Sequence, residues 1–166
     1  MPPIVLFAIQ FTLSLVVYGL AGFWYVAPRL ARMTREQAVV PLLWVHVFRI
    51  VGGTILAPGA VDAAVPDDFR TMVGLGDMAT AALAVIALVA LRGRGSWAIG
   101  LVWLCLVVGN IDTLNAVIQS IRYDVFADAL GVNWVIVTCY VPALLVSSVL
   151  MVIQLLRPAA HEPTRT

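Results

Sequence analysis

The chain has 166 residues, of which 62% are hydrophobic and only 11% are charged, and its formal net charge at pH 7 is +1. Soluble domains carry about 25% charged residues, so this composition excludes an ordinary soluble domain and predicts an integral membrane protein. The near-neutral charge, without a basic stripe, excludes nucleic acid as the expected partner. All ten cationic side chains are arginine. This bias is typical of a GC-rich bacterial genome, so we expect the bacterial plasma membrane as the location.

Five apolar stretches follow one another along the chain, each about as long as a transmembrane helix. They cover residues 4–27, 38–57, 72–91, 97–121 and 132–156. Pro28 is expected to end the first stretch and Pro58 the second. Helices are expected because backbone groups in lipid must be satisfied within the segment, and no alternating barrel pattern is present. We therefore predict an all-α polytopic membrane protein, with one domain over residues 1–157 and a short disordered tail over 158–166.

The arginines predict how these helices are oriented in the membrane. The first and third connections and the tail contain Arg29, Arg32, Arg35, Arg92, Arg94, Arg157 and Arg165. The second and fourth connections are acidic and contain only Arg70 and Arg122. Short arginine-rich connections stay in the cytoplasm. We therefore expect the N-terminus outside and the C-terminus in the cytoplasm, which agrees with an odd number of spans.

Six strongly polar side chains interrupt the predicted membrane helices. They are His46, Arg49, Asp77, Asn110, Asp112 and Asn115. An ionisable group within a membrane segment costs several kcal/mol by roughly any scale, and it marks a functional site by default. At a rise of about 1.5 Å per residue, the charged members come out in the outer half of the bilayer, near the level of Gln10 and Thr138. The sequence therefore predicts one polar site in the outer half.

The helical spacing indicates which polar residues share a face. His46, Arg49 and Gly53 form an i, i+3, i+7 stripe on the second helix, and Asp112 and Asn115 share a face of the fourth. Glycines accompany the charged positions on the second and third helices, at Gly52, Gly53, Gly74 and Gly76. Small residues let membrane helices approach closely. We expect the helices to come close together at this level.

A count of charges suggests how the site works. Arg49 with one aspartate forms a neutral pair, and Asp77 is the better match in depth. Asp112 then needs a proton, a protonated His46 or a bound cation. This predicts Asp112 as the acid or base, with His46 and Asp77 as further catalytic candidates. The alternative, which stays open, is that Arg49 and Asp77 form a structural pair that fixes helix register.

The remaining polar residues are candidates for substrate binding. We assign that role to Arg49, for an anionic or carbonyl oxygen, and to Asn115, Asn110 and Gln10. Asn110 falls on a different face from Asp112, so a hydrogen bond to a neighbouring helix is its alternative, and the same alternative holds for Gln10. The two outer connections, residues 59–71 and 122–130, are either short interfacial helices over the site or ordinary loops.

No cofactor is predicted from the sequence. Cys105 and Cys139 lie within apolar stretches without metal-ligand spacing, so we expect them to pack as small apolar residues and we predict no metal site. A haem with His46 as its single axial ligand is a minor alternative. The other histidine, His161, lies in the tail at the opposite side of the membrane and cannot complete a pair.

The polar site favours a membrane-embedded enzyme that acts on a lipophilic substrate, such as a lipid or an isoprenoid, by acid–base chemistry. The alternative is a proton- or ion-coupled carrier, or an accessory subunit of a membrane complex. The span below Asp77 is apolar as far as Leu91, and a conduction path would need polar groups along its length. The expected partner is a membrane lipid or lipophilic small molecule, and an oligomer or a membrane partner is left open.

Overall fold

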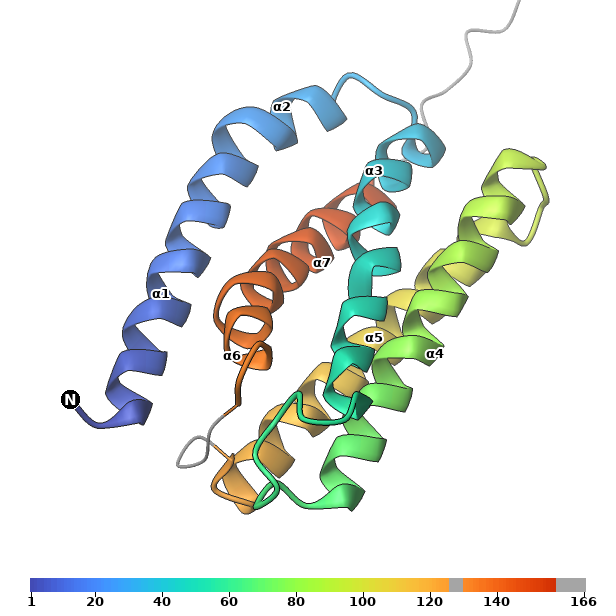
Figure 1. Cartoon of the computed structure of the whole chain (residues 1–166). Helices are drawn as coiled ribbons and strands as arrows, with labels where there is room; N and C mark the ends of the chain where they lie inside the picture. The colour runs from blue at the N-terminus through green and yellow to red at the C-terminus, as the bar shows by residue number, and fades with distance from the viewer. Residues whose placement is uncertain (126–129, 158–166) are drawn as a thin grey trace, which may run out of the picture.

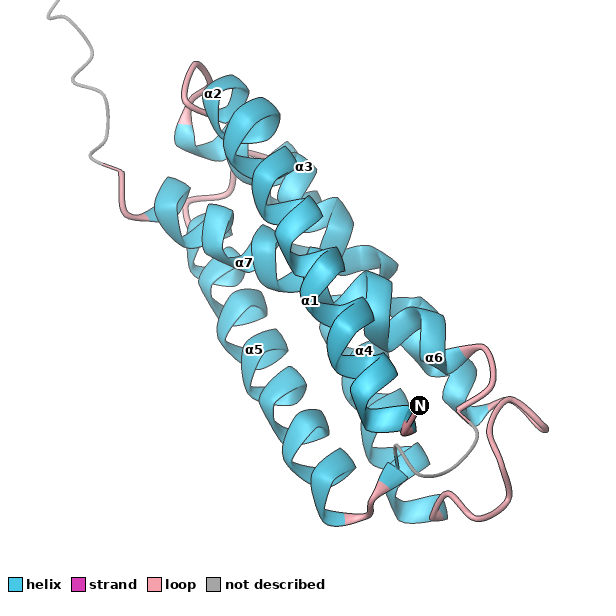
Figure 2. Ribbon diagram, turned by 90° about the vertical axis from the view of Figure 1, so that its left-hand side faces the viewer, coloured by secondary structure: helices cyan, strands magenta, loops and turns pink. Residues whose placement is uncertain are grey.

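The computed structural model describes residues 1–125 and 130–157, and these residues form helices joined by short connections, with no strand among them (Figures 1 and 2). Within this described part, five helical segments are long and apolar enough to cross a membrane: Pro3–Leu30, Arg35–Leu56, Asp67–Arg92, Ala98–Arg122 and Asn133–Leu155. The predicted tail, 158–166, lies outside the described residues. The predicted all-α architecture with five apolar helices is confirmed.

Three of the five segments are built from several helical elements. The first consists of α1 (Pro3–Ala21), the π-helical turn η1 (Gly22–Val26) and α2 (Ala27–Leu30). The second consists of α3 (Arg35–Val47) and the 3₁₀ helix η2 (Phe48–Leu56). The third and fourth are the single helices α4 (Asp67–Arg92) and α5 (Ala98–Arg122). The fifth consists of α6 (Asn133–Val135), the π-helical turn η4 (Ile136–Tyr140) and α7 (Val141–Leu155).

The helix ends differ from the predicted ones at two places. Pro28 does not end the first segment. It stands at the start of α2, directly after the π-helical turn, where the missing N–H of a proline leaves no helical hydrogen bond unmade. The third segment begins at Asp67 rather than at residue 72. Asp67 and Asp68 occupy its first turn, where acidic side chains interact favourably with the helix dipole. Hydropathy does not register such a polar first turn.

The helices are packed unequally. α4 packs along α5 and against η2 and α3, and α3 packs on α7. α1 lies at the edge of the bundle, where it packs chiefly on η4 and α7, and none of its residues is buried (Figure 1). We call the end that carries residue 1 and the start of α4 the N-terminal end of the bundle. The connections between α2 and α3 and between α4 and α5 lie at the other end, the C-terminal end (Figure 1).

Two apolar clusters form the interior. The larger one occupies the C-terminal half and includes Leu30, Ala38, Val39, Leu42, Leu43, Ala84, Ala87, Val102, Cys105, Leu106, Leu150, Met151 and Leu155. The smaller one closes the N-terminal end and consists of Ile55, Val61, Val65, Phe69, Val125 and Leu130. Between them lies the level of the polar residues. The interior is therefore apolar at both ends and polar in between.

The two connections predicted to lie outside, residues 59–71 and 122–130, form no separate interfacial helix in their described residues. Residues 57–66 form turns, and the apolar side chains of Val61 and Val65 are buried within the smaller cluster instead of resting on lipid. Phe69 already belongs to the first turns of α4. In the connection 122–130, α5 ends at Arg122 and is followed by a turn, and residues 126–129 of that stretch lie outside the described part.

Helix α4 packs through a stripe of small residues. Thr80, Ala84 and Ala87 are fully buried at i, i+4 and i+7, while Ala82 on the same helix is exposed. Small side chains let membrane helices approach closely enough for backbone and side-chain packing. This stripe positions α4 against its neighbours, and with it Asp77 one turn further toward the N-terminal end.

The stripe generates a stability prediction. Ala87→Leu should lower the free energy of unfolding by about 1–3 kcal/mol, because the added atoms overpack a site with no free space. Ala82→Leu is the matched control and should change it by less than about 0.5 kcal/mol, since position 82 is exposed. The measurement is the denaturation midpoint of the two variants in mild detergent. Equal midpoints would show that the stripe is not a tight interface.

Candidate functional site

The 3₁₀ helix η2 sets the position of the buried arginine. With about 3.0 residues per turn, residues at i, i+3 and i+6 share one face of such a helix. The buried residues of η2 are Arg49, Gly52 and Ile55, which follow this period. The predicted α-helical stripe through His46, Arg49 and Gly53 is therefore wrong at Gly53, which faces Met78 instead. Runs of 3₁₀ helix longer than about four residues are uncommon and often accompany functional segments.

The guanidinium of Arg49 donates hydrogen bonds to two aspartates and to α5. Its Nε donates to Asp77 Oδ1 at 2.8 Å, and its Nη2 lies 2.7 Å from the same oxygen and donates to Asp112 Oδ2 at 2.6 Å. Its Nη1 donates to the Gly109 carbonyl and to Thr113 Oγ1, both at 3.0 Å. A guanidinium has five N–H groups. All five therefore have an acceptor, and the side chains of Arg49, Asp77 and Asp112 are only 3%, 16% and 15% exposed.

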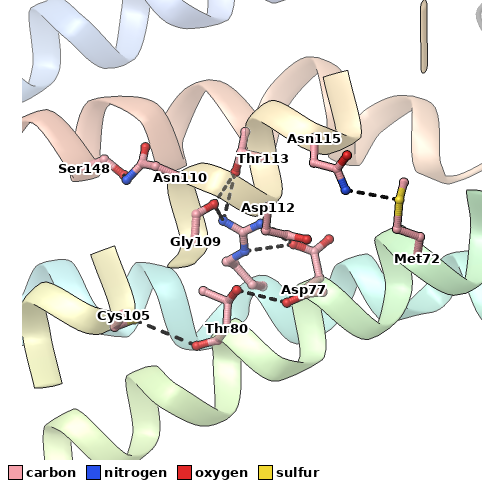
Figure 3. Close-up of polar contacts among 12 residues, drawn as sticks. Met72, Asp77, Thr80, Cys105, Gly109, Asn110, Asp112, Thr113, Asn115 and Ser148 are labelled. Carbon is pink, nitrogen blue, oxygen red and sulfur yellow. Dashed lines mark hydrogen bonds and ion pairs between the residues drawn. The ribbon is translucent and has the colours of Figure 1, made fainter. Parts of the chain in front are cut away.

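The ion cluster corrects the predicted pairing. Arg49 pairs with Asp77 as expected, but it also binds Asp112, which the sequence reading left without an arginine partner (Figure 3). Asp77 Oδ1 lies close to two guanidinium nitrogens, whereas Asp112 accepts from one. Two carboxylates and one guanidinium carry a net charge of −1 when all are ionised. Asp112 has the weaker compensation of the two.

Two glycines make room for the carboxylates. A Cβ on Gly52 would lie 1.8 Å from Asp77 Oδ2, and a Cβ on Gly76 would lie 1.8 Å from Asp112 Oδ1. Neither distance is compatible with a side chain at the glycine. Close approach of the helices beside the charged residues, as the sequence predicted, is confirmed at both positions. Each carboxylate thus lies against the bare backbone of the adjacent helix.

An apolar cavity of about 340 Å³ adjoins the ion cluster. Its polar end contains Arg49, Asp77, Asp112 and Thr113. Most other lining side chains are apolar, among them Ile4, Phe7, Phe11, Ile55, Phe69, Val73, Ala116, Val117, Ile121, Val125, Leu130, Val137 and Leu144. The site is therefore an apolar cavity with charged groups at one place on its wall.

The cavity reaches the side of the bundle between α1 and α5. Ile4 on α1 is 51% exposed, and Val117 and Ile121 on α5 are 48% and 70% exposed, yet all three line the cavity. The helix α1 packs chiefly on η4 and α7 and so leaves this side of α5 uncovered. In a membrane this side faces the lipid chains.

Thr113 and Tyr140 are polar residues of the cavity wall that the sequence did not indicate, as are Ser120 and Asn133. Thr113 donates to the Gly109 carbonyl at 2.8 Å and accepts from Arg49, and the only signal for it was its position next to Asp112. Tyr140 lines the cavity, and its hydroxyl donates to the Val45 carbonyl of α3. A tyrosine in the middle of an apolar segment resembles an ordinary core residue. Neither residue could be assigned to the site without the fold.

The other predicted catalytic candidate, His46, lies apart from the cavity wall. It is 1% exposed, and neither ring nitrogen has a hydrogen-bond partner in the described structure. It is therefore not bonded to Asp112, as the sequence had suggested, and its roles in catalysis and in binding haem remain predictions without a supporting contact. Asn115 also points elsewhere, because its Nδ2 lies 3.1 Å from Met72 Sδ (Figure 3).

Asn110 and Gln10 connect helices instead of lining the cavity. Asn110 Nδ2 contacts Ser148 Oγ on α7 at 3.4 Å, which confirms the expected bond to a neighbouring helix (Figure 3). Gln10 Oε1 accepts from Trp134 Nε1 at 2.6 Å and so ties α1 to α6. Both residues thus follow the alternative reading of helix-to-helix contacts, and their predicted role in substrate binding has no contact that supports it.

The cysteines and acids do not cluster around a metal position in the described residues. Cys105 is buried in the larger apolar cluster, as expected for a packing residue, with its Sγ 3.9 Å from the Thr80 carbonyl. Cys139 is exposed on the bundle surface, 4.0 Å from Ser14 Oγ. Within the described ranges, no three His, Cys, Asp or Glu side chains lie together as metal ligands would.

Comparison with known proteins gives a family. Residues 6–156 match the family model described as Domain of unknown function (DUF8737), and the chain belongs to this family. Neither a curated protein nor a solved structure matches the chain. The matched region contains the whole ion cluster and nearly all of the cavity wall. The function has to be inferred from the chemistry of this site.

The ion cluster should be essential for folding. Arg49→Gln removes the counter-charge of two partly buried carboxylates and should cost about 3–5 kcal/mol of unfolding free energy. Arg122→Gln, at an exposed position, is the control and should cost less than about 0.5 kcal/mol. Adding Asp77→Asn and Asp112→Asn to Arg49→Gln should recover much of the loss. Denaturation midpoints in mild detergent measure all three, and no recovery in the triple variant would contradict the electrostatic explanation.

The glycine beside Asp112 should not tolerate a methyl group. Gly76→Ala places a Cβ within 1.8 Å of Asp112 Oδ1 and should displace the carboxylate, with a loss of about 1–3 kcal/mol. Gly100→Ala is the matched control, because it is also helical and has no atom within 4 Å of the new Cβ. That variant should be neutral or stabilising by up to about 1 kcal/mol. Equal thermal midpoints for both variants would argue against the tight carboxylate position.

Proposed function

We propose that this member of the DUF8737 family is a membrane-embedded enzyme that acts on a lipophilic small molecule, a lipid or an isoprenoid-like compound, by acid–base chemistry. The observation that carries the proposal is the apolar cavity whose wall contains Asp77 and Asp112. Ligand sites are typically concave, mostly apolar and furnished with a few convergent polar groups. The volume of about 340 Å³ lies within the usual range of such sites.

Asp112 is the proposed acid. The cluster carries one negative charge in excess of Arg49, and a proton on one carboxyl would neutralise it. Asp77 Oδ1 lies against two guanidinium nitrogens and is the better compensated carboxylate, so the proton belongs on Asp112. Its Oδ1 has no hydrogen-bond partner in the described structure. A carboxylic acid in that position can give its proton to a substrate in the cavity and take one back in the reverse step.

Arg49 acts as a positioning residue in this proposal. The sequence reading assigned it to a substrate oxygen, but all five of its N–H groups are used within the protein. To bind substrate directly it would have to release one of these acceptors. Its role is instead to hold Asp77 ionised and Asp112 in place, both in the cavity wall.

The aromatic lining suits a reaction with a positive intermediate. Phe7, Phe11 and Phe69 lie in the cavity wall together with Tyr140. The faces of aromatic rings attract cations, by about 2 kcal/mol or more where water is excluded. Protonation of a substrate double bond by Asp112, followed by return of a proton from a neighbouring carbon to the Asp112 carboxylate, is an isomerisation that balances without any other reactant. This is the reaction type that we propose.

The proposed orientation has the N-terminus outside and the C-terminus in the cytoplasm of a bacterium, in the plasma membrane. Most arginines outside the cavity level lie near the C-terminal end of the bundle, at Arg29, Arg32, Arg35, Arg92, Arg94 and Arg157. Cytoplasmic connections of membrane proteins are rich in arginine. The cavity would then lie in the outer half of the bilayer and take its substrate from the outer leaflet.

The carrier alternative is less well supported than the enzyme. The C-terminal half of the bundle is filled by the larger apolar cluster, in which Leu43, Val102 and Met151 are fully buried. A path for protons or ions needs polar groups along its whole length. The cavity is thus a chamber with a closed inner end. This arrangement suits binding and chemistry at one level better than transport across the membrane.

Lipid analysis of the purified protein tests the proposal. The protein from mild detergent should retain about one equivalent of a small lipophilic compound, detected by native mass spectrometry. Ala116→Phe fills the cavity beside Asp112 and should remove the compound, whereas Ala82→Phe, on the lipid-facing side of α4, should not. Purification of the native protein without any bound lipophilic compound would contradict a substrate cavity. Equal retention of the compound in both variants would contradict it as well.

Catalysis is tested with the trapped compound. Asp112→Asn keeps the size of the side chain but cannot deliver the proton, so the bound compound should shift from the mixture of isomers found in the native protein to one isomer. Chromatography of the released compound measures that ratio. An unchanged ratio in the folded variant would exclude Asp112 as the acid. Acidification of proteoliposomes under an imposed potential would instead favour the carrier.

A further inference from the structure

A second hollow lies at the C-terminal end of the bundle, between α3 and α4. It has a volume of about 900 Å³ and is open to the outside. Its wall includes Arg35, Glu36 and Trp44 of α3, Val89 and Arg92 of α4, and Arg94 of the connection that follows α4. None of these residues lines the cavity beside Asp112. We call this hollow the arginine groove.

The groove has an excess of positive charge at one end. Arg35, Arg92 and Arg94 line it, against the single acid Glu36. Arg35 Nε lies 3.6 Å from Glu36 Oε1, outside hydrogen-bond geometry. The side chains of Arg92 and Arg94 have no hydrogen-bond or ion-pair partner among the described residues. The groove therefore presents the two unpaired guanidinium groups of Arg92 and Arg94, beside the ion pair of Arg35 and Glu36.

A defined turn presents Arg94 beside the groove. After α4, the amides of Arg94 and Gly95 donate to the carbonyls of Leu91 and Ala90, both at 3.1 Å. Arg94 has a φ of 53°, a left-handed conformation that is uncommon for residues other than glycine. The turn keeps Arg94 in this conformation with its side chain on the groove wall. The cationic end of the groove is thus built into the α4–α5 connection.

The rest of the groove is apolar and extends along the bundle. Val40 and Trp44 on α3 face Val85 and Val89 on α4 across it, and Trp44 and Val89 are 52% and 67% exposed. From Thr34 to Trp44 the groove follows α3 for about 15 Å, at about 1.5 Å per residue. A groove that is cationic at the membrane surface and apolar for this distance below it has the polarity of a phospholipid.

We propose that the arginine groove binds an anionic phospholipid, with the phosphate between Arg92, Arg94 and Arg35 and one acyl chain along the α3–α4 wall. Guanidinium groups bind phosphate through paired N–H donors. The apolar wall favours a lipid over free phosphate, because phosphate leaves that wall exposed. The site is independent of the proposed enzyme activity, since it shares no residue with the cavity at the other end of the bundle.

Native mass spectrometry with defined lipids tests the groove. The purified protein is titrated with phosphatidylglycerol and with phosphatidylcholine of identical chains, in the native sequence, in Arg92→Gln/Arg94→Gln and in Arg32→Gln. Arg32 is an exposed arginine at the same end and does not line the groove, so that variant is the matched control. Removal of two arginines should weaken phosphatidylglycerol binding about tenfold or more, while Arg32→Gln binds like the native protein.

Each other outcome overturns the proposal in a distinct way. Equal binding of phosphatidylcholine and phosphatidylglycerol would show that the groove does not select an anionic headgroup. Displacement of the lipid by millimolar inorganic phosphate, with phosphate bound in its place, would show a free-phosphate site. Unchanged phosphatidylglycerol binding in the double variant would place the lipid elsewhere. Thermal midpoints of the variants verify that each is folded, which the exposed positions of Arg92 and Arg94 favour.

Discussion

The structure depends on the complete satisfaction of one buried guanidinium. A charge in an apolar interior is costly unless it is paired and hydrogen-bonded. Arg49 meets this condition with five donors distributed over Asp77, Asp112, Thr113 and the Gly109 carbonyl. These acceptors belong to α4 and α5, while the arginine belongs to η2. The interaction therefore joins three helical segments at one level, and the local backbone has to accommodate it.

The need to accommodate Arg49 and its two carboxylates explains the 3₁₀ geometry of η2 and the glycines beside the ion cluster. The 3₁₀ geometry of η2 turns Gly52 onto the same face as Arg49, where an α-helix would rotate it about 60° away. With Gly52 there, the carboxylate of Asp77 can lie against the backbone, and Gly76 does the same for Asp112. From this level toward the C-terminal end of the bundle, α4 continues with alanines packed against its neighbouring helices. The polar site and the apolar half thus use small residues for different purposes.

The sequence predicted the helices well because the bilayer restricts what can cross it. Length and apolarity located all five segments, and the 100° rotation per residue separated Asn110 from Asp112 correctly. The rotation of each helix about its own axis is set by packing against its neighbours, and a hydropathy profile carries no information about that packing. For that reason the 3₁₀ segment, the second aspartate on Arg49 and the position of His46 away from the cavity were missed. The cavity itself depends on α1 standing away from α5, which no local pattern records.

The charge imbalance of the cluster links its stability to its function. With Arg49 matched by two carboxylates, one negative charge remains in an apolar surrounding, and a proton or a bound cation must neutralise it. The larger apolar cluster fills the C-terminal half of the bundle, whereas both aspartates line the cavity. In the function that we propose, a molecule in the cavity would therefore meet carboxyl groups that can give or take a proton. In the proposed function, the surplus charge, which would be a cost in a purely structural pair, is what lets the site carry a proton.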